Sequence, residues 1–171
     1  AAKTRHRPLR SRQADSGFGC PTWSVDGTPS DCVNIALAHL LPAGAPAIEG
    51  VVSGINIGRN TSLAFIIASG TIGGAWEGAL HGLPAVALSQ DIPMPAFARL
   101  REAGGKPEPE LHATLRLSAR HAARLAPELL SQTPLRSFTV HNLNFPYPAH
   151  PDSPVRRTVP AHNILPRLFA P

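Results

Sequence analysis

The chain has 171 residues, of which 43% are hydrophobic, so it holds enough apolar material for one globular domain with its own core. Charged residues make up 16% and the formal net charge is +5, which excludes a polycationic tail protein and weakly favours acidic ligands. No apolar stretch approaches the length of a membrane span, and no signal-peptide apolar region follows the arginine-rich start. We therefore expect a single domain over 1–171, located in the cytoplasm and not in a membrane.

The first segment, to about Asp15, is basic and could form either an edge strand or a solvated arm. Its basic residues are Lys3, Arg5, Arg7, Arg10 and Arg12. Because no aromatic side chains that could stack on bases are interleaved with them, we interpret the segment as a solvated face rather than a nucleic-acid patch. A short strand is expected over 23–25.

A helix start follows this strand. Thr28 is expected as the N-cap, Pro29 as the first helical residue, and Asp31 as the side chain that reaches back to the cap. Apolar residues at helical spacing come next, and the helix should end near 42–44. A buried strand is then predicted over 48–52.

Two glycine-rich turns lie close together after this strand. The turn at 53–60 follows the apolar run directly, and the turn at 69–74 opens a helix that should close at Gly82. Such turns gather N–H groups and short polar side chains around an anion at a helix N-terminus, and glycine lets the backbone approach the ligand. A strand over 85–89 completes a βαβ unit, whose loops at the strand C-termini are the usual ligand sites.

The second half of the chain is more strongly punctuated by proline. We expect a connection over 93–109, then a helix from Leu111 that Pro127 interrupts or ends. A further strand is expected over 138–145. The remainder, 146–171, is predicted to be an irregular, proline-rich arm.

Five segments in this order resemble the SurE family of survival-protein nucleotidases. They cover residues 27–33, 51–60, 69–71, 82–89 and 142–146. The resemblance implies a Rossmann-like, three-layer α/β fold with a mostly parallel sheet. It also implies a metal-dependent acid phosphatase that hydrolyses nucleoside monophosphates to nucleoside and phosphate.

The resemblance also assigns site residues, although it identifies no catalytic residue. Asn56 matches the family's metal-binding asparagine, whose neutral oxygen suits magnesium or manganese. Asn60 and the run Ser69, Gly70 and Thr71 match the neighbouring phosphate or substrate contacts. From the residues alone, Asn56 could instead satisfy backbone groups of its turn, and Ser69 or Thr71 could be an ordinary helix N-cap.

SurE proteins begin with a strand that ends in paired aspartates and a serine-bearing loop, and they continue into a C-terminal oligomerisation arm. We expect this chain to lack both, so its fold should be incomplete at both ends and should hold a divalent ion poorly. The leading hypothesis is a nucleotidase that is a homo-oligomer in the full-length family. Two alternatives stay open, a non-catalytic nucleotide- or phosphate-binding module and a basic RNA-associating protein.

Overall fold

A parallel sheet of three strands forms the centre of the molecule. The computed structural model describes residues 3–42 and 44–162, and its main sheet has the order β3 (Val51–Ile57), β4 (Ala85–Gln90) and β5 (Val140–Phe145). Both strand pairs are parallel. The predicted α/β fold with a parallel sheet is therefore confirmed.

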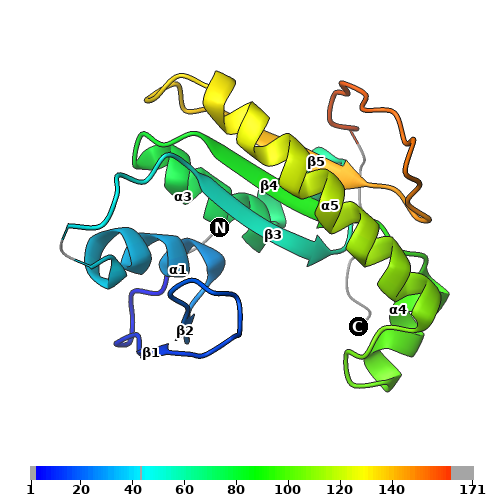
Figure 1. Ribbon diagram of the computed structural model, residues 1–171, viewed down its shortest axis with the longest axis horizontal. Helices are drawn as coiled ribbons and strands as arrows, with labels where there is room; N and C mark the ends of the chain where they lie inside the picture. Colours follow the sequence, from blue (N-terminus) through cyan, green and yellow to red (C-terminus); the bar gives the residue numbers. More distant parts are fainter. Residues whose placement is uncertain (1–2, 43, 163–171) are drawn as a thin grey trace.

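Helices cover both faces of this sheet and complete three layers (Figure 1). On one side lie α1 (Pro29–Ile35) and α3 (Gly70–Leu80), and on the other lies the long helix α5 (Pro109–Gln132). The connection from β3 through α3 to β4 is the expected βαβ unit. It brings the segments after β3 and before α3 to the carboxyl edge of the sheet.

The alternating side chains of β4 divide the core into two clusters. Ala85 and Ala87 face α3 and pack with Ile72 and Ala75. Val86 and Leu88 point to the opposite face, toward α5. They pack there in a second cluster with Ala122, Ala126 and Phe145. Because successive strand residues point to opposite faces, a short apolar strand with helices on both sides is buried along its whole length.

Smaller elements surround this centre. A hairpin of β1 (Ser11–Gln13) and β2 (Trp23–Val25) forms a separate antiparallel pair, and the predicted strand over 23–25 is confirmed. A π-helical turn, η1 (Ala36–Leu40), prolongs α1. A short helix that the sequence pattern did not predict, α2 (Leu63–Ala68), precedes α3. In the described part of the chain, no helix is both long and apolar enough to cross a membrane.

The expected connection over 93–109 was wrong, because it contains helix α4 (Met94–Glu102). Its prolines and glycines stand at the ends of the helix rather than inside it. Pro93 is the N-cap, and Gly104 and Gly105 follow the last turn with φ of +60° and +86°. Proline in a first turn and glycine after a last turn both favour a helix.

Pro127 does not end or interrupt its helix, contrary to expectation, since α5 continues to Gln132. A proline inside a helix costs about 3 kcal/mol or more. The turn beyond it packs Leu129 and Leu130 against the apolar cluster on the α5 face of the sheet. Complete burial of a leucine contributes about 1.5–3 kcal/mol, so these two partly buried leucines offset part of the cost of the proline.

The first glycine-rich segment is not simply a turn, because β3 continues through it to Ile57. Gly54 has φ of +125°, and a Cβ there would lie 2.3 Å from the Leu88 carbonyl oxygen of β4. The register between β3 and β4 shifts at this point, between Ser53 and Asn56. Gly54 is therefore required for the approach of two strands and not for the approach of a ligand.

Residues 146–162 run beyond β5 without a helix or strand of their own, apart from one isolated bridge between Ser62 and Ala161. The rest of the predicted arm, 163–171, lies outside the described residues.

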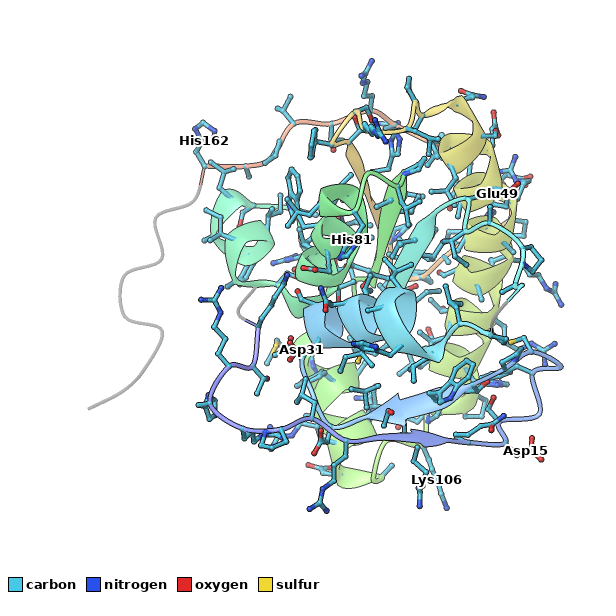
Figure 2. The ribbon with its side chains drawn as sticks, turned by 90° about the vertical axis from the view of Figure 1, so that its left-hand side faces the viewer. Asp15, Asp31, Glu49, His81, Lys106 and His162 are labelled. Atoms are coloured by element: carbon cyan, nitrogen blue, oxygen red, sulfur yellow. The ribbon has the colours of Figure 1, made fainter. Side chains whose placement is uncertain are left out.

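Two buried carboxylates hold the N-terminal segment against the helices. Asp31 accepts hydrogen bonds from the N–H and hydroxyl of Thr28 and from the N–H and hydroxyl of Thr4. Its own N–H donates to Thr28 Oγ1, and this bond with the one from the Thr28 N–H forms the predicted capping box. Glu77 of α3 lies 2.7 Å from the ammonium of Lys3 and also accepts from Asn34. Figure 2 shows Asp31 at the start of α1, facing the N-terminal segment.

Substitution of Gly78 tests how closely α3 approaches β3. An added Cβ would lie 2.6 Å from Val51 Cβ, so Gly78→Ala should lower the free energy of unfolding by about 1–2 kcal/mol, although alanine favours a helix. Urea unfolding measures this change. Leu80→Ala, at an exposed position of the same helix, should change stability by only about 0.5 kcal/mol. A Gly78→Ala protein as stable as wild type would contradict the close packing.

Asp31 should make stability depend on acid pH. Burial raises its pKa, but the hydrogen bonds from Thr28 and Thr4 outweigh this effect and lower the pKa from 3.8 to about 2. The stabilisation is therefore present above about pH 4 and is lost as the pH falls toward 2, and it amounts to about 2 kcal/mol. Asp31→Asn should be less stable than wild type at pH 6, with the difference shrinking between pH 4 and 2 in thermal unfolding. Asp15→Asn, on the exposed hairpin, is the control for the loss of one carboxylate.

Candidate functional site

Three polar residues stand side by side where the strands of the main sheet end. Asn56 of β3 and Asn144 of β5 are both the register partners of Ser89 of β4. Ser89 shares the face of Ala85 and Ala87, so this row lies on the α3 side of the sheet. The carboxyl edge of a parallel sheet is where α/β proteins bind ligands, and this edge is polar here.

Asn60 is held at this edge by all its main-chain polar groups and by its amide nitrogen. Its N–H donates to Asn144 Oδ1 at 2.7 Å, its carbonyl accepts from Asn142 Nδ2 at 2.8 Å, and its Nδ2 donates to Ser89 Oγ at 2.8 Å. The residue is only 5% exposed. The bond to Ser89 uses one of the two hydrogens of Asn60 Nδ2, so the other can donate to a phosphate oxygen while Ser89 keeps the side chain in place.

Asn56 is oriented by a carbonyl of its own turn. Its Nδ2 donates to the Gly58 oxygen at 2.9 Å, which is the backbone-satisfying role that the sequence left open. That bond fixes which end of the amide is the nitrogen, and it leaves Oδ1 as the atom that can accept from or coordinate a ligand. Gly58 itself has φ of +127°, so a turn does follow β3.

Ser69, Gly70 and Thr71 lie at the N-terminus of α3. Ser69 Oγ accepts from the Ile72 N–H at 3.2 Å, so the N-cap interpretation of Ser69 is confirmed. The N–H groups of Gly70 and Thr71 belong to the first helical turn, where no acceptor exists within the helix. Aligned peptide dipoles add partial positive charge at the same place.

The packing of α3 on β3 shows how far this N-terminus lies along the strand. A Cβ on Gly78 would touch Val51, and a Cβ on Gly74, one turn earlier, would lie 2.7 Å from Ser53 Oγ. Helix and strand are thus antiparallel, and four helical residues match two strand residues. One further turn brings the chain to Gly70, where a Cβ would lie 3.2 Å from Pro29 Cγ, so the start of α3 lies beside the start of α1 toward the carboxyl end of β3.

The metal site implied by the resemblance is only partly provided. Mg²⁺ and Mn²⁺ take about six oxygens, usually including carboxylates. Across residues 3–42 and 44–162, no three or more His, Cys, Asp or Glu side chains form a group that could hold a metal ion. Asn56 Oδ1 is one neutral oxygen, so these residues do not fit a whole metal site by themselves.

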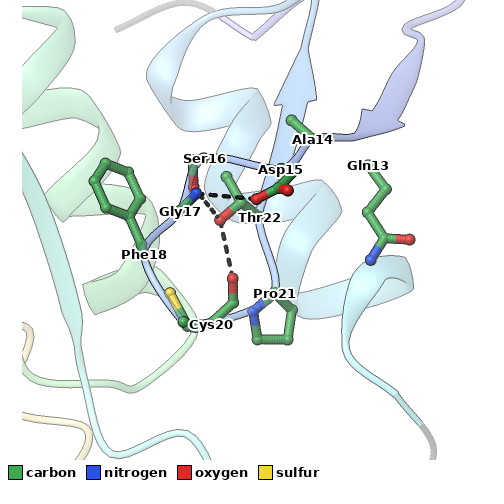
Figure 3. A pocket seen from close by; sticks show the side chains of 10 residues that line it. Gln13, Ala14, Asp15, Ser16, Gly17, Phe18, Cys20, Pro21 and Thr22 are labelled. Atoms are coloured by element: carbon green, nitrogen blue, oxygen red, sulfur yellow. Dashed lines mark hydrogen bonds between the residues drawn. The ribbon is translucent and has the colours of Figure 1, made fainter.

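An open hollow lies away from this edge. Residues 13–22, in the loop of the β1–β2 hairpin, enclose an open space of about 630 Å³ (Figure 3). The loop is braced by its own hydrogen bonds, such as Gly17 N–H to Asp15 Oδ1 at 3.0 Å and Thr22 Oγ1 to the Cys20 carbonyl at 3.1 Å. None of the candidate site residues lines the hollow, so we interpret it as the opening of a loop.

Ser89, Asn142 and Asn144 were given no role by the sequence analysis, although they build this edge. A signal was present, because Ser89 ends the predicted strand over 85–89, and Asn142 and Asn144 alternate near the end of the predicted strand over 138–145. Carboxyl-terminal positions of parallel strands meet at one edge, so polar residues there belong to the same site. Their hydrogen bonds with Asn60 span 29 to 84 residues and could not be read from spacing.

Comparisons with known proteins agree with this architecture. The family described as "Survival protein SurE" matches residues 1–164. A "5'-nucleotidase SurE" of Methanosarcina barkeri is 35% identical over 160 residues, covering 92% of this chain and 56% of the relative. A "5'-nucleotidase SurE" of Desulforudis audaxviator is 47% identical over 87 residues, covering 50% of this chain and 32% of the relative.

A solved structure gives the same result. The SurE protein from Aquifex aeolicus superposes with a TM-score of 0.60 at 27% identity, covering 85% of this chain and 49% of that one. The chain thus spans about a third to about half the length of the relatives that it matches. The family match extends over nearly the whole chain, the parallel sheet agrees with the solved fold, and the chain therefore belongs to the SurE family.

Proposed function

We propose that this chain carries the phosphate-binding side of a 5'-nucleotidase that hydrolyses nucleoside monophosphates to nucleoside and phosphate. The observation that supports this most is that Asn56 and the N-terminus of α3 both lie toward the carboxyl end of β3, because α3 runs antiparallel to that strand. The names of the curated relatives supply the reaction class.

In this proposal the start of α3 binds the phosphoryl group. Ser69 Oγ accepts from Ile72, so its own O–H remains free to donate to a phosphoryl oxygen, and the N–H groups of Gly70 and Thr71 point the same way as the helix dipole. Negative charge on the transferring group grows or spreads in the transition state, so donors fixed in advance accelerate the reaction. Asn60 stays in the proposal as a phosphate neighbour, with one N–H of its amide bonded to Ser89 and the other able to donate to phosphate.

We further propose that turnover depends on magnesium or manganese, with Asn56 Oδ1 as one ligand. A hexacoordinate ion requires further oxygens beyond this one, and the described residues do not supply them as a cluster. A homo-oligomeric state and a cytoplasmic location, which the resemblance implies, belong to the same proposal.

A second candidate function is nucleotide or phosphate binding without turnover. The donor set favours it, because hydroxyls and N–H groups are present around the start of α3 while no acidic cluster occurs in the described ranges. The two functions differ in one measurable respect, since only the nucleotidase releases inorganic phosphate.

The nucleotidase predicts metal-dependent release of inorganic phosphate from a nucleoside monophosphate. Turnover with added Mn²⁺ or Mg²⁺ should disappear on chelation, and Asn56→Ala should lower kcat/KM at least about tenfold, because one oxygen ligand is lost. Val52→Ala, at a half-exposed position of the same strand, is the control and should keep wild-type turnover. No release from folded wild type, together with nucleotide binding in calorimetry, would favour the binding module.

Ser69→Ala separates capping from phosphate binding. Loss of the N-cap should cost about 1 kcal/mol of stability, and loss of the hydroxyl donor should also raise KM or the inhibition constant of inorganic phosphate several-fold. Thr28 caps α1 in the same way, since its Oγ1 accepts from the Asp31 N–H at 3.2 Å. Thr28→Ala should therefore lower stability without changing KM. If both variants change KM equally, Ser69 acts only as a cap.

A further inference from the structure

Two asparagines of β5 hold the loop after β3 by its main chain. Asn142 and Asn144 stand two residues apart, so they share one face of the strand. Asn144 Oδ1 accepts the Asn60 N–H at 2.7 Å, and Asn142 Nδ2 donates to the Asn60 carbonyl at 2.8 Å. Asn144 Nδ2 also donates to Asn142 Oδ1 at 3.2 Å, which orients the two amides relative to each other. We refer to this pair as the asparagine clamp.

The chemistry of the clamp suits a positioning role. A side-chain amide has both an N–H donor and a carbonyl acceptor. The acceptor of Asn144 binds the Asn60 main-chain N–H, and the donor of Asn142 binds the Asn60 carbonyl. Because Asn60 is 5% exposed, its backbone groups would be costly to leave without partners. The clamp contacts backbone and not a variable side chain, so it fixes where residue 60 lies.

The loop is fastened at its far end as well. Leu63 N–H donates to the Ala161 carbonyl at 3.0 Å, and Ala161 N–H donates to the Thr61 carbonyl at 3.0 Å. Between these bonds and the clamp, the chain from Asn60 to Leu63 has little freedom, and Gly58 is held separately by its N–H, which donates to the Gln90 carbonyl at 2.9 Å. Gly58 lies two residues before Asn60, and its carbonyl is the group that orients the Asn56 amide.

We propose that Asn142 and Asn144 are positioning residues of the nucleotide site. The clamp fixes the end of the turn at Asn60, the Gln90 carbonyl fixes its start at Gly58, and the Gly58 carbonyl keeps Asn56 Oδ1 directed to the ligand. This inference rests on the proposed function for its effect on turnover, whereas its structural part stands on the hydrogen bonds alone. Neither residue needs to contact the substrate for the proposal to hold.

Asn144→Ala tests the clamp with three readouts. Hydrogen exchange of the Asn60 amide, followed by NMR, should accelerate at least about tenfold because its acceptor is gone. The side-chain amide signals of Asn56 should shift. In phosphate release from a nucleoside monophosphate, kcat/KM should fall about tenfold or more, as expected when a site group is displaced without being removed.

Two further variants make the result specific. His141→Ala lies on the other face of β5 and removes a 2.7 Å bond with Thr133, so it loosens the same strand without touching the clamp. It should leave Asn60 exchange and kcat/KM unchanged. Asn144→Asp keeps an acceptor for the Asn60 N–H and should restore Asn60 protection, with part of the turnover.

Two outcomes overturn the proposal. One is wild-type protection of the Asn60 amide in Asn144→Ala, and the other is an equal loss of kcat/KM in Asn144→Ala and His141→Ala. If wild type releases no phosphate, the nucleotidase proposal fails separately. The clamp is then tested by hydrogen exchange of the Asn60 amide and by the side-chain signals of Asn56. Unchanged Asn56 signals in Asn144→Ala would contradict it.

Discussion

Complete burial of β4 is the constraint on which the rest of the molecule depends. All six of its residues are buried, and its two neighbours in the sheet and the helices on both faces are arranged around it. Small alanines face α3 and larger Val86 and Leu88 face α5, so the two helical layers can lie at different distances from the sheet. The strand that makes the core also ends in Ser89, and the candidate site is built on that end.

The main chains of α3, β3 and β4 lie unusually close together, and this packing places the site relative to the core. Glycines on α3 let the helix lie directly on β3, and Gly54 lets β3 lie against the Leu88 carbonyl of β4. Because α3 is antiparallel to β3 and tightly packed on it, the position of its N-terminus is set by contacts made two turns away. A phosphate site at a helix N-terminus therefore takes its geometry from apolar packing, and only its charge comes from the polar groups themselves.

The polar edge follows a different rule from the core. Its asparagines and serine satisfy one another and one stretch of main chain, so few buried polar groups are left over, and Ser62 Oγ is the one such side-chain atom without a partner among the described residues. A network of this kind specifies a position rather than supplying much stability, because each bond replaces one with water. This property suits a site that must hold Asn56 and the start of α3 in fixed relation.

The sequence by itself determined the elements whose signals are local. Thr28, Pro29 and Asp31 give the start of α1, Ser69 caps α3, and the apolar run of β4 marks a buried strand, because caps and periodicity act within a few residues. Only tertiary structure decided that β3 runs past Gly54, that α5 tolerates Pro127, and that Asn142 and Asn144 meet Asn60. In each of these cases the deciding contact comes from another element of the fold, so the spacing of neighbours in sequence does not predict it.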